Sequence, residues 1–73
     1  MKEEPVKIQL TRSQAIVLFE WLSRADKVGP FSSSEQRVLW LIEGQLEKNL
    51  VEPLKPDYPE LVEAAHKAVD EGG

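Results

Sequence analysis

The chain begins with a short segment in which apolar and polar residues alternate. Along residues 6–10 the order is Val6, Lys7, Ile8, Gln9 and Leu10. A period of two sends alternate side chains to opposite faces of an extended backbone, so this segment predicts a β-strand with one buried face. The sequence offers no second convincing strand, because residues 28–31 contain a proline and permit only edge pairing. We therefore expect the segment either to pair with the same strand of another subunit or to lie as an extended arm over the helices.

Helix-start signals follow the alternating segment. Thr11 and Gln14 have the spacing of a capping box, in which each side chain bonds the backbone N–H of the other residue, and this predicts a helix over about residues 12–25. A run of serines followed by glutamate provides overlapping N-caps for a second helix over about residues 32–50.

Glycine and proline separate these helices, and a connector with three prolines precedes a third helix over about residues 57–70. The predicted fold is therefore mainly α, a short N-terminal β-strand followed by a small three-helix bundle. We expect a single domain spanning residues 1–73, with residues 1–5 and 71–73 flexible.

The apolar residues of each helix predict which side faces the core. The core stripe of the first helix is formed by Ala15, Leu18, Phe19 and Leu22, with Ile16 at its side. The main stripe of the second helix is Val38, Leu39, Ile42, Leu46 and Leu50. The third helix has one ordinary stripe of Leu61, Ala65 and Ala68, with Val62 and Val69 at its edge.

Further apolar residues lie on other sides of the first two helices. They are Val17 and Trp21 on the first helix and Trp40 and Gly44 on the second. This surplus exceeds what one thin three-helix core covers, so these four residues are the candidate interface with another protein. A glycine inside a helix costs about 1 kcal/mol relative to alanine, so Gly44 predicts a close contact around Trp40, one turn away.

The small size of the chain favours a partner. A chain of 73 residues buries only about 60% of its unfolded surface, and such domains commonly add disulfides, a metal or a second subunit. The absence of cysteine excludes disulfides and thiolate metal sites. We therefore expect a homodimer, or binding to another protein.

The net charge of the chain and the length of its apolar runs limit the kinds of partner and the cellular compartment that we expect. The formal net charge of −4 argues against non-specific binding to nucleic acid or to an anionic membrane. The longest apolar runs, residues 15–19 and 38–42, are much shorter than the roughly 20 residues of a membrane span. The charged N-terminus lacks the apolar stretch of a signal peptide, and together with the missing cysteines this predicts a cytoplasmic protein.

No residue pattern indicates catalysis. Glu63 and His66 have the Glu-x-x-His spacing of di-metal bundles, but such a site needs two motifs and further inward carboxylates. Nucleophilic catalysis needs a base beside the nucleophile, and no serine lies near the single histidine in the sequence. The glycines are too scattered to form a phosphate-binding loop. We therefore expect no enzymatic activity, no metal and no cofactor.

Two stretches of the chain resemble a group of short bacterial proteins. They are residues 7–24, KIQLTRSQAIVLFEWLSR, and residues 35–69, EQRVLWLIEGQLEKNLVEPLKPDYPELVEAAHKAV. The similarity includes "VLFE" in the first helix and the "VEP…PDY" connector. Because the group is uncharacterised, the resemblance implies a bacterial source and a strand with three helices, but no activity.

An alternative function follows from the order of the predicted elements. A strand followed by two helices resembles the ribbon-helix-helix regulators and antitoxins, in which the strands of two chains pair and enter the major groove of DNA. Lys7 and Gln9 would then contact the bases. The acidic composition and the single basic residue on the strand depart from that family.

Overall fold

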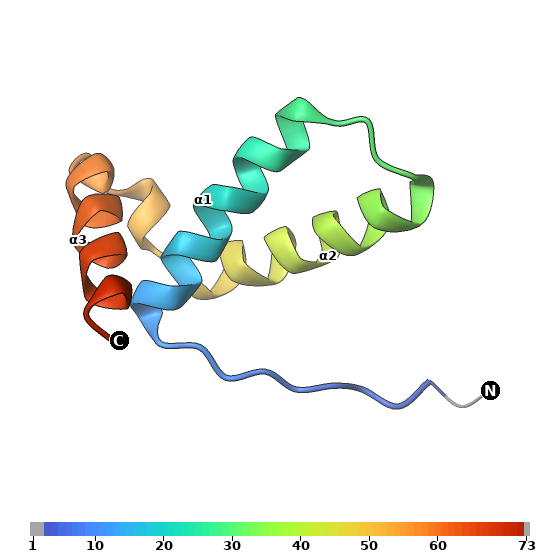
Figure 1. Cartoon of the computed structure of the whole chain (residues 1–73), viewed down its shortest axis with the longest axis horizontal. Coiled ribbons are helices and arrows are strands. Elements are labelled where there is room, and N and C mark those ends of the chain that lie inside the picture. The colour runs from blue at the N-terminus through green and yellow to red at the C-terminus, as the bar shows by residue number, and fades with distance from the viewer. Residues whose placement is uncertain (1–2, 73) are drawn as a thin grey trace.

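The computed structural model describes residues 3–72 and is mainly helical. In chain order, its elements are α1 (Arg12–Val28), α2 (Ser33–Asn49), the single 3-10 turn η1 (Glu52–Leu54) and α3 (Tyr58–Asp70). Helix α1 packs against both α2 and α3 and is the central element of the molecule (Figure 1). The prediction of a fold built on three helices is confirmed. Of the end residues that were predicted to be flexible, 1, 2 and 73 lie outside the described part.

Both predicted helix starts are confirmed by their capping boxes. The hydroxyl of Thr11 accepts a hydrogen bond from the Gln14 N–H at 3.1 Å, and the Gln14 side chain accepts one from the Thr11 N–H at 2.9 Å. Ser32 and Glu35 make the same two bonds at 3.2 and 2.8 Å. Helix α1 continues three residues beyond the predicted end, because no helix-breaking residue occurs before Gly29.

The predicted N-terminal strand is not formed within the described single chain. Residues 3–10, which we call the N-terminal arm, contain no regular secondary structure and form a drawn-out segment before α1 (Figure 1). The arm does not lie over the helices either, since Val6 is 87% exposed and Ile8 is 78% exposed. A strand requires backbone partners, and the described part of the chain has no other strand to supply them.

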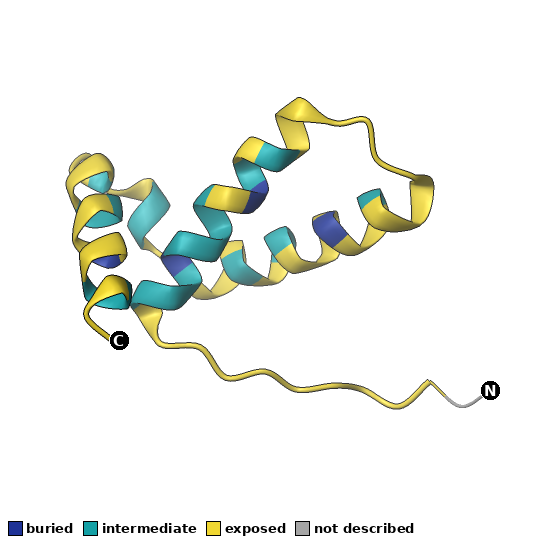
Figure 2. Ribbon diagram, in the orientation of Figure 1, coloured by how far each residue is buried: buried dark blue, intermediate teal, exposed yellow. Residues whose placement is uncertain are grey.

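The core is small and lies where α1 meets the end of α2 and the middle of α3. Its buried members are Ile16, Leu50 and Ala65, and half-buried residues surround them (Figure 2). Ile16 was predicted at the side of α1, and that prediction is wrong because α3 covers the same side of the helix. The predicted burial of Leu39 and Ala65 is confirmed.

Two polar links join α1 to the C-terminal part of the chain. The guanidinium of Arg12 donates from Nε and Nη2 to the two carboxylate oxygens of Glu52, at 2.9 and 2.8 Å. The hydroxyl of Tyr58 donates to Glu20 at 2.9 Å. Partial burial beside the Glu20 carboxylate raises the pKa of the Tyr58 hydroxyl. The two links fix η1 and the start of α3 against α1.

Candidate functional site

The four residues of the predicted interface form two pairs, one on each of the first two helices. Val17 is half-buried and packs against the core, so α1 uses it inside the chain. Trp21, one turn further along, is 56% exposed. On α2, Trp40 is 59% exposed. A Cβ added to Gly44 would meet nothing within 4 Å, so the close contact predicted around Trp40 is wrong within one chain.

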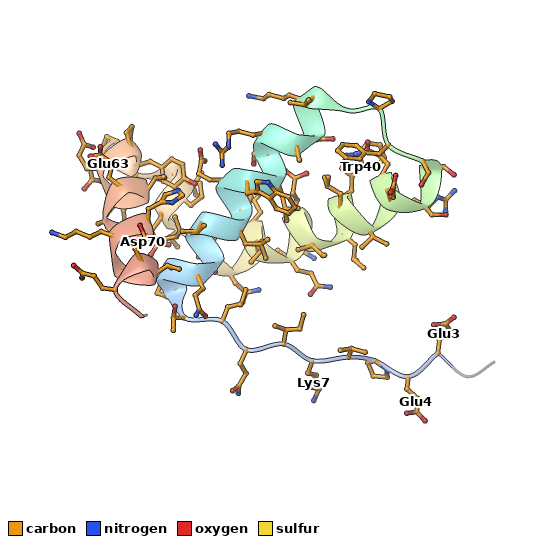
Figure 3. The ribbon with its side chains drawn as sticks, viewed as in Figure 1. Glu3, Glu4, Lys7, Trp40, Glu63 and Asp70 are labelled. Carbon is orange, nitrogen blue, oxygen red and sulfur yellow. The ribbon has the colours of Figure 1, made fainter. Side chains whose placement is uncertain are left out.

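Trp40 has a role in holding the first two helices together. Its indole N–H donates to the Asp26 carboxylate at 3.3 Å, and the Gln36 side-chain amide donates to the same oxygen at 2.8 Å. Asp26 lies near the end of α1, so these bonds span the loop that leads to α2, and Trp40 lies near that loop in Figure 3. This contact uses the edge of the indole ring and leaves more than half of the residue's surface open.

The seam between α1 and α2 has a polar side. Ser23 donates to the Glu43 carboxylate at 3.3 Å, and Asp26 accepts from Gln36 and Trp40. These residues recur at intervals of three or four along their helices, which places them on one side of each helix. That side of the seam is closed by hydrogen bonds.

The other side of the same seam is apolar and open. An open pocket of about 400 Å³ lies there, and its lining residues are Leu22, Ser34, Glu35, Val38, Leu39 and Ile42. Val38 is 55% exposed and Ile42 is 37% exposed, although the sequence predicted both in the core stripe of α2. That prediction is wrong because α1 covers the Leu39 side of α2 and leaves the adjoining side uncovered.

The apolar surface extends beyond the pocket on both helices. Leu41, which is 60% exposed, lies one turn from Val38 on α2. On α1, Leu18 lies one turn from Leu22 and also from Trp21. We call this region the open face; it comprises the pocket residues Leu22, Val38 and Ile42, of which Leu22 is buried, and the neighbouring Leu18, Trp21 and Leu41, of which Leu18 is half-buried. Leu41 was not predicted from the sequence, although its place in the unbroken apolar run 38–42 was a signal that one side of this helix lacks cover.

The N-terminal arm adds exposed apolar side chains to the same molecule. Val6, Ile8 and Leu10 are exposed, and so are Lys7 and Gln9 between them (Figure 3). Residues 6–10 therefore have the alternating pattern that predicted a strand, but no other part of the described chain covers their apolar side chains.

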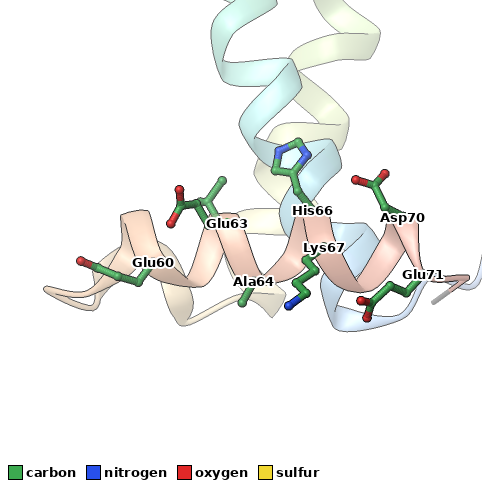
Figure 4. A pocket seen from close by; sticks show the side chains of 8 residues that line it. Glu60, Glu63, Ala64, His66, Lys67, Asp70 and Glu71 are labelled. Carbon is green, nitrogen blue, oxygen red and sulfur yellow. The ribbon is translucent and has the colours of Figure 1, made fainter.

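The surface of α3 holds the single histidine in a shallow depression. His66 lies there among carboxylates and one lysine (Figure 4). Glu63 and His66 are both exposed, and the described residues contain no group of three or more potential ligands among His, Cys, Asp and Glu that could hold a metal ion. Within residues 3–72, the Glu-x-x-His pair is therefore not part of a group that could hold a metal ion.

The serines between the helices belong to the start of α2. Ser32 accepts the N-cap hydrogen bond, and Ser33 is the first residue of the helix.

Among residues 3–72, no helix has the length and apolar character needed to cross a membrane.

Comparison of the chain with protein-family models, with curated proteins and with solved structures found no match.

Proposed function

We propose that the protein is a non-catalytic interaction module that acts as a homodimer. The supporting observation is its excess surface. The chain exposes 6106 Å², whereas a folded monomer of 8.3 kDa exposes about 4,600 Å². The exposed apolar side chains of the open face and the arm are part of this surface, and their contact with water is unfavourable.

The shape of the chain supports the same proposal. Its radius of gyration is 13.6 Å, compared with about 11 Å for a compact chain of this length. The drawn-out arm adds to this extent (Figure 1), and the α1–α2 pair has an open pocket on one side. A second copy that covers these parts would bring the surface nearer to that of an ordinary folded protein.

Sedimentation velocity with a matched pair of variants tests this function. Leu41→Glu places a charge on the open face, whereas Leu54→Glu places the same charge on η1, where the leucine is 88% exposed and outside the open face. We expect the unaltered chain and Leu54→Glu to sediment as dimers at tens of micromolar, and Leu41→Glu to sediment as a monomer. An unaltered chain that stays monomeric at these concentrations would contradict the proposal.

A second candidate function is a ribbon-helix-helix-like DNA-binding regulator or antitoxin. It is favoured by the free arm, which keeps an apolar side available to pair with another arm and leads directly into α1 and α2. In such a ribbon Lys7 and Gln9 would face the major groove. A screen of genomic DNA fragments by mobility shift would test it. Lys7→Ala and Gln9→Ala are then expected to abolish binding to a specific site and to leave the dimer intact.

A further inference from the structure

In the single chain, the aliphatic side chains of the N-terminal arm and most side chains of the open face are exposed. We propose that they cover each other between two copies, so that the arm of one copy lies in the open-face pocket of its partner. Val6, Ile8 and Leu10 would then contact the partner's open face, centred on Val38 and Ile42. The inference rests on the homodimer proposed above and adds the segment that holds the two copies together.

The spacing of the apolar side chains in the arm suits the helix that would receive it. Side chains on one side of an extended chain repeat every two residues, or about 6.7 Å. Val38 and Ile42 lie four residues apart on α2, which corresponds to about 6 Å along the helix axis. An arm that runs along α2 can therefore place successive aliphatic side chains against successive turns of the helix.

The pocket and the arm also match in polarity. Four of the six residues that line the pocket are Leu22, Val38, Leu39 and Ile42, and its polar members lie at the α2 start. Within residues 6–10 the polar side chains, Lys7 and Gln9, lie on the opposite side from the aliphatic ones, so they would remain in water. No buried charge would result from this contact.

The area that would be covered is close to what a stable dimer needs. A fully exposed aliphatic side chain carries about 100 Å² of apolar surface and an aromatic one about 200 Å². On this scale the exposed fractions of the arm and open-face side chains give roughly 500 Å² of apolar surface per copy. Because somewhat over half of an interface is apolar, this corresponds to about 800 Å² per partner, the usual size of a stable interface.

The exposure of the arm in its own chain favours a second copy of the protein as the binding partner. The arm leaves α1 at its capping box and makes no close packing with its own helices, as the exposure of Val6 and Ile8 shows. A segment that is free in its own chain can be exchanged between identical protomers at little cost, and a two-fold dimer exchanges both arms. The two pockets and two arms of such a dimer are then all occupied.

Cysteine cross-linking tests the contact directly, because the chain contains no cysteine of its own. Two single variants, Ile8→Cys in the arm and Ile42→Cys in the pocket, are mixed and exposed to oxidised glutathione. A disulfide requires Cα atoms within about 7 Å, so it forms only where the two segments meet. We expect a disulfide-linked heterodimer of the two variants. Glu63→Cys, on the exposed surface of α3, is the control partner and is expected not to cross-link to Ile8→Cys.

Different outcomes separate this inference from the homodimer itself. Rapid self-linking of Ile8→Cys without the mixed product would show that two arms pair with each other and would overturn the inference. A disulfide within single chains of the Ile8→Cys/Ile42→Cys double variant at high dilution would show that the arm occupies its own pocket. If sedimentation shows dimers but no mixed disulfide forms, the arm exchange is contradicted and the homodimer proposal is retained. Monomers at every concentration would end both.

A second matched pair measures how much the arm contributes. Ile8→Asp puts a charge on the apolar side of the arm, whereas Gln9→Asp puts one on its polar side. We expect Ile8→Asp to raise the dissociation constant of the dimer at least about ten-fold, and Gln9→Asp to change it little. Equal effects of the two substitutions would contradict the proposed orientation of the arm.

Discussion

Gly44 shows how a single residue can be interpreted from the sequence and then differently from the structure. A glycine inside a helix suggests a close neighbour, yet a Cβ added at Gly44 would meet nothing within 4 Å in the single chain. Alanine is the better helix former, so Gly44→Ala is expected to raise the free energy of unfolding by up to about 1 kcal/mol. Urea unfolding measures this change. A weaker dimer in the same variant would place the second copy against Gly44 instead.

The ionisation of Glu52 is tied to the fold. Its carboxylate accepts hydrogen bonds from Arg12 and from the Val51 N–H, and these lower its pKa to about 2 from an ordinary value of 4.5. The folded state therefore favours the ionised carboxylate. Its contribution to stability is complete above about pH 4.5 and is lost as the pH falls through about 2.

This linkage predicts a difference between two glutamate variants. Glu52→Gln is expected to reduce the fall in the thermal unfolding midpoint between pH 5 and about pH 2, because it removes the group that titrates. The effect should be modest, since Arg12 is largely exposed to solvent. Glu47→Gln, which removes an exposed carboxylate of α2, is the control and should keep the pH dependence of the unaltered chain. Identical profiles for both variants would contradict the assignment.

At the scale of elements, the sequence predicted the helices well and their packing less well. The capping residues Thr11 and Ser32 determine where α1 and α2 begin, and such signals are local. Which side of a helix is covered depends instead on its neighbours. Ile16 is buried because α3 lies over it, and Val38 is exposed because no other element reaches it. Periodicity alone could not supply that information.

The N-terminal strand failed as a prediction for a related reason. Alternation describes a segment that is ready to place one side against a surface, but it does not show that the surface belongs to the same chain. In residues 6–10 the pattern is present and the surface is missing. The candidate interface was likewise predicted only in part, because Trp21 and Trp40 are exposed whereas Val17 is used in the core.

The contact of α3 with α1 can be tested by two adjacent alanines. Ala65 is only 3% exposed, whereas Ala64 next to it faces solvent. Ala65→Leu adds volume where the core has little room and is expected to lower the free energy of unfolding by about 1–3 kcal/mol. Ala64→Leu should change it by no more than about 0.5 kcal/mol. Denaturant unfolding of both variants measures the difference, and equal losses would show that α3 is not seated as described.

At the scale of the whole molecule, stability should depend on concentration. Only five hydrophobic residues are buried in the described chain, so one copy has a thin core. If a second copy covers the open face, association and folding are coupled by mass action, and the unfolding midpoint rises with protein concentration. Thermal unfolding over a hundred-fold range of concentration would show this rise, and a constant midpoint would indicate that one chain folds unaided.

The two tryptophans report which side of the molecule meets its partner. Trp21 belongs to the open face. Trp40 lies two residues from both Val38 and Ile42, which is about 200° around the helix, so it faces the opposite side of α2. A partner on the open face therefore covers Trp21 and leaves Trp40 beside Asp26 in water. Trp40→Phe and Trp21→Phe each leave one tryptophan to observe. As the concentration rises, we expect quenching by acrylamide to weaken for Trp21 and to stay constant for Trp40. Protection of Trp40 alone would place the interface on the polar side of the seam.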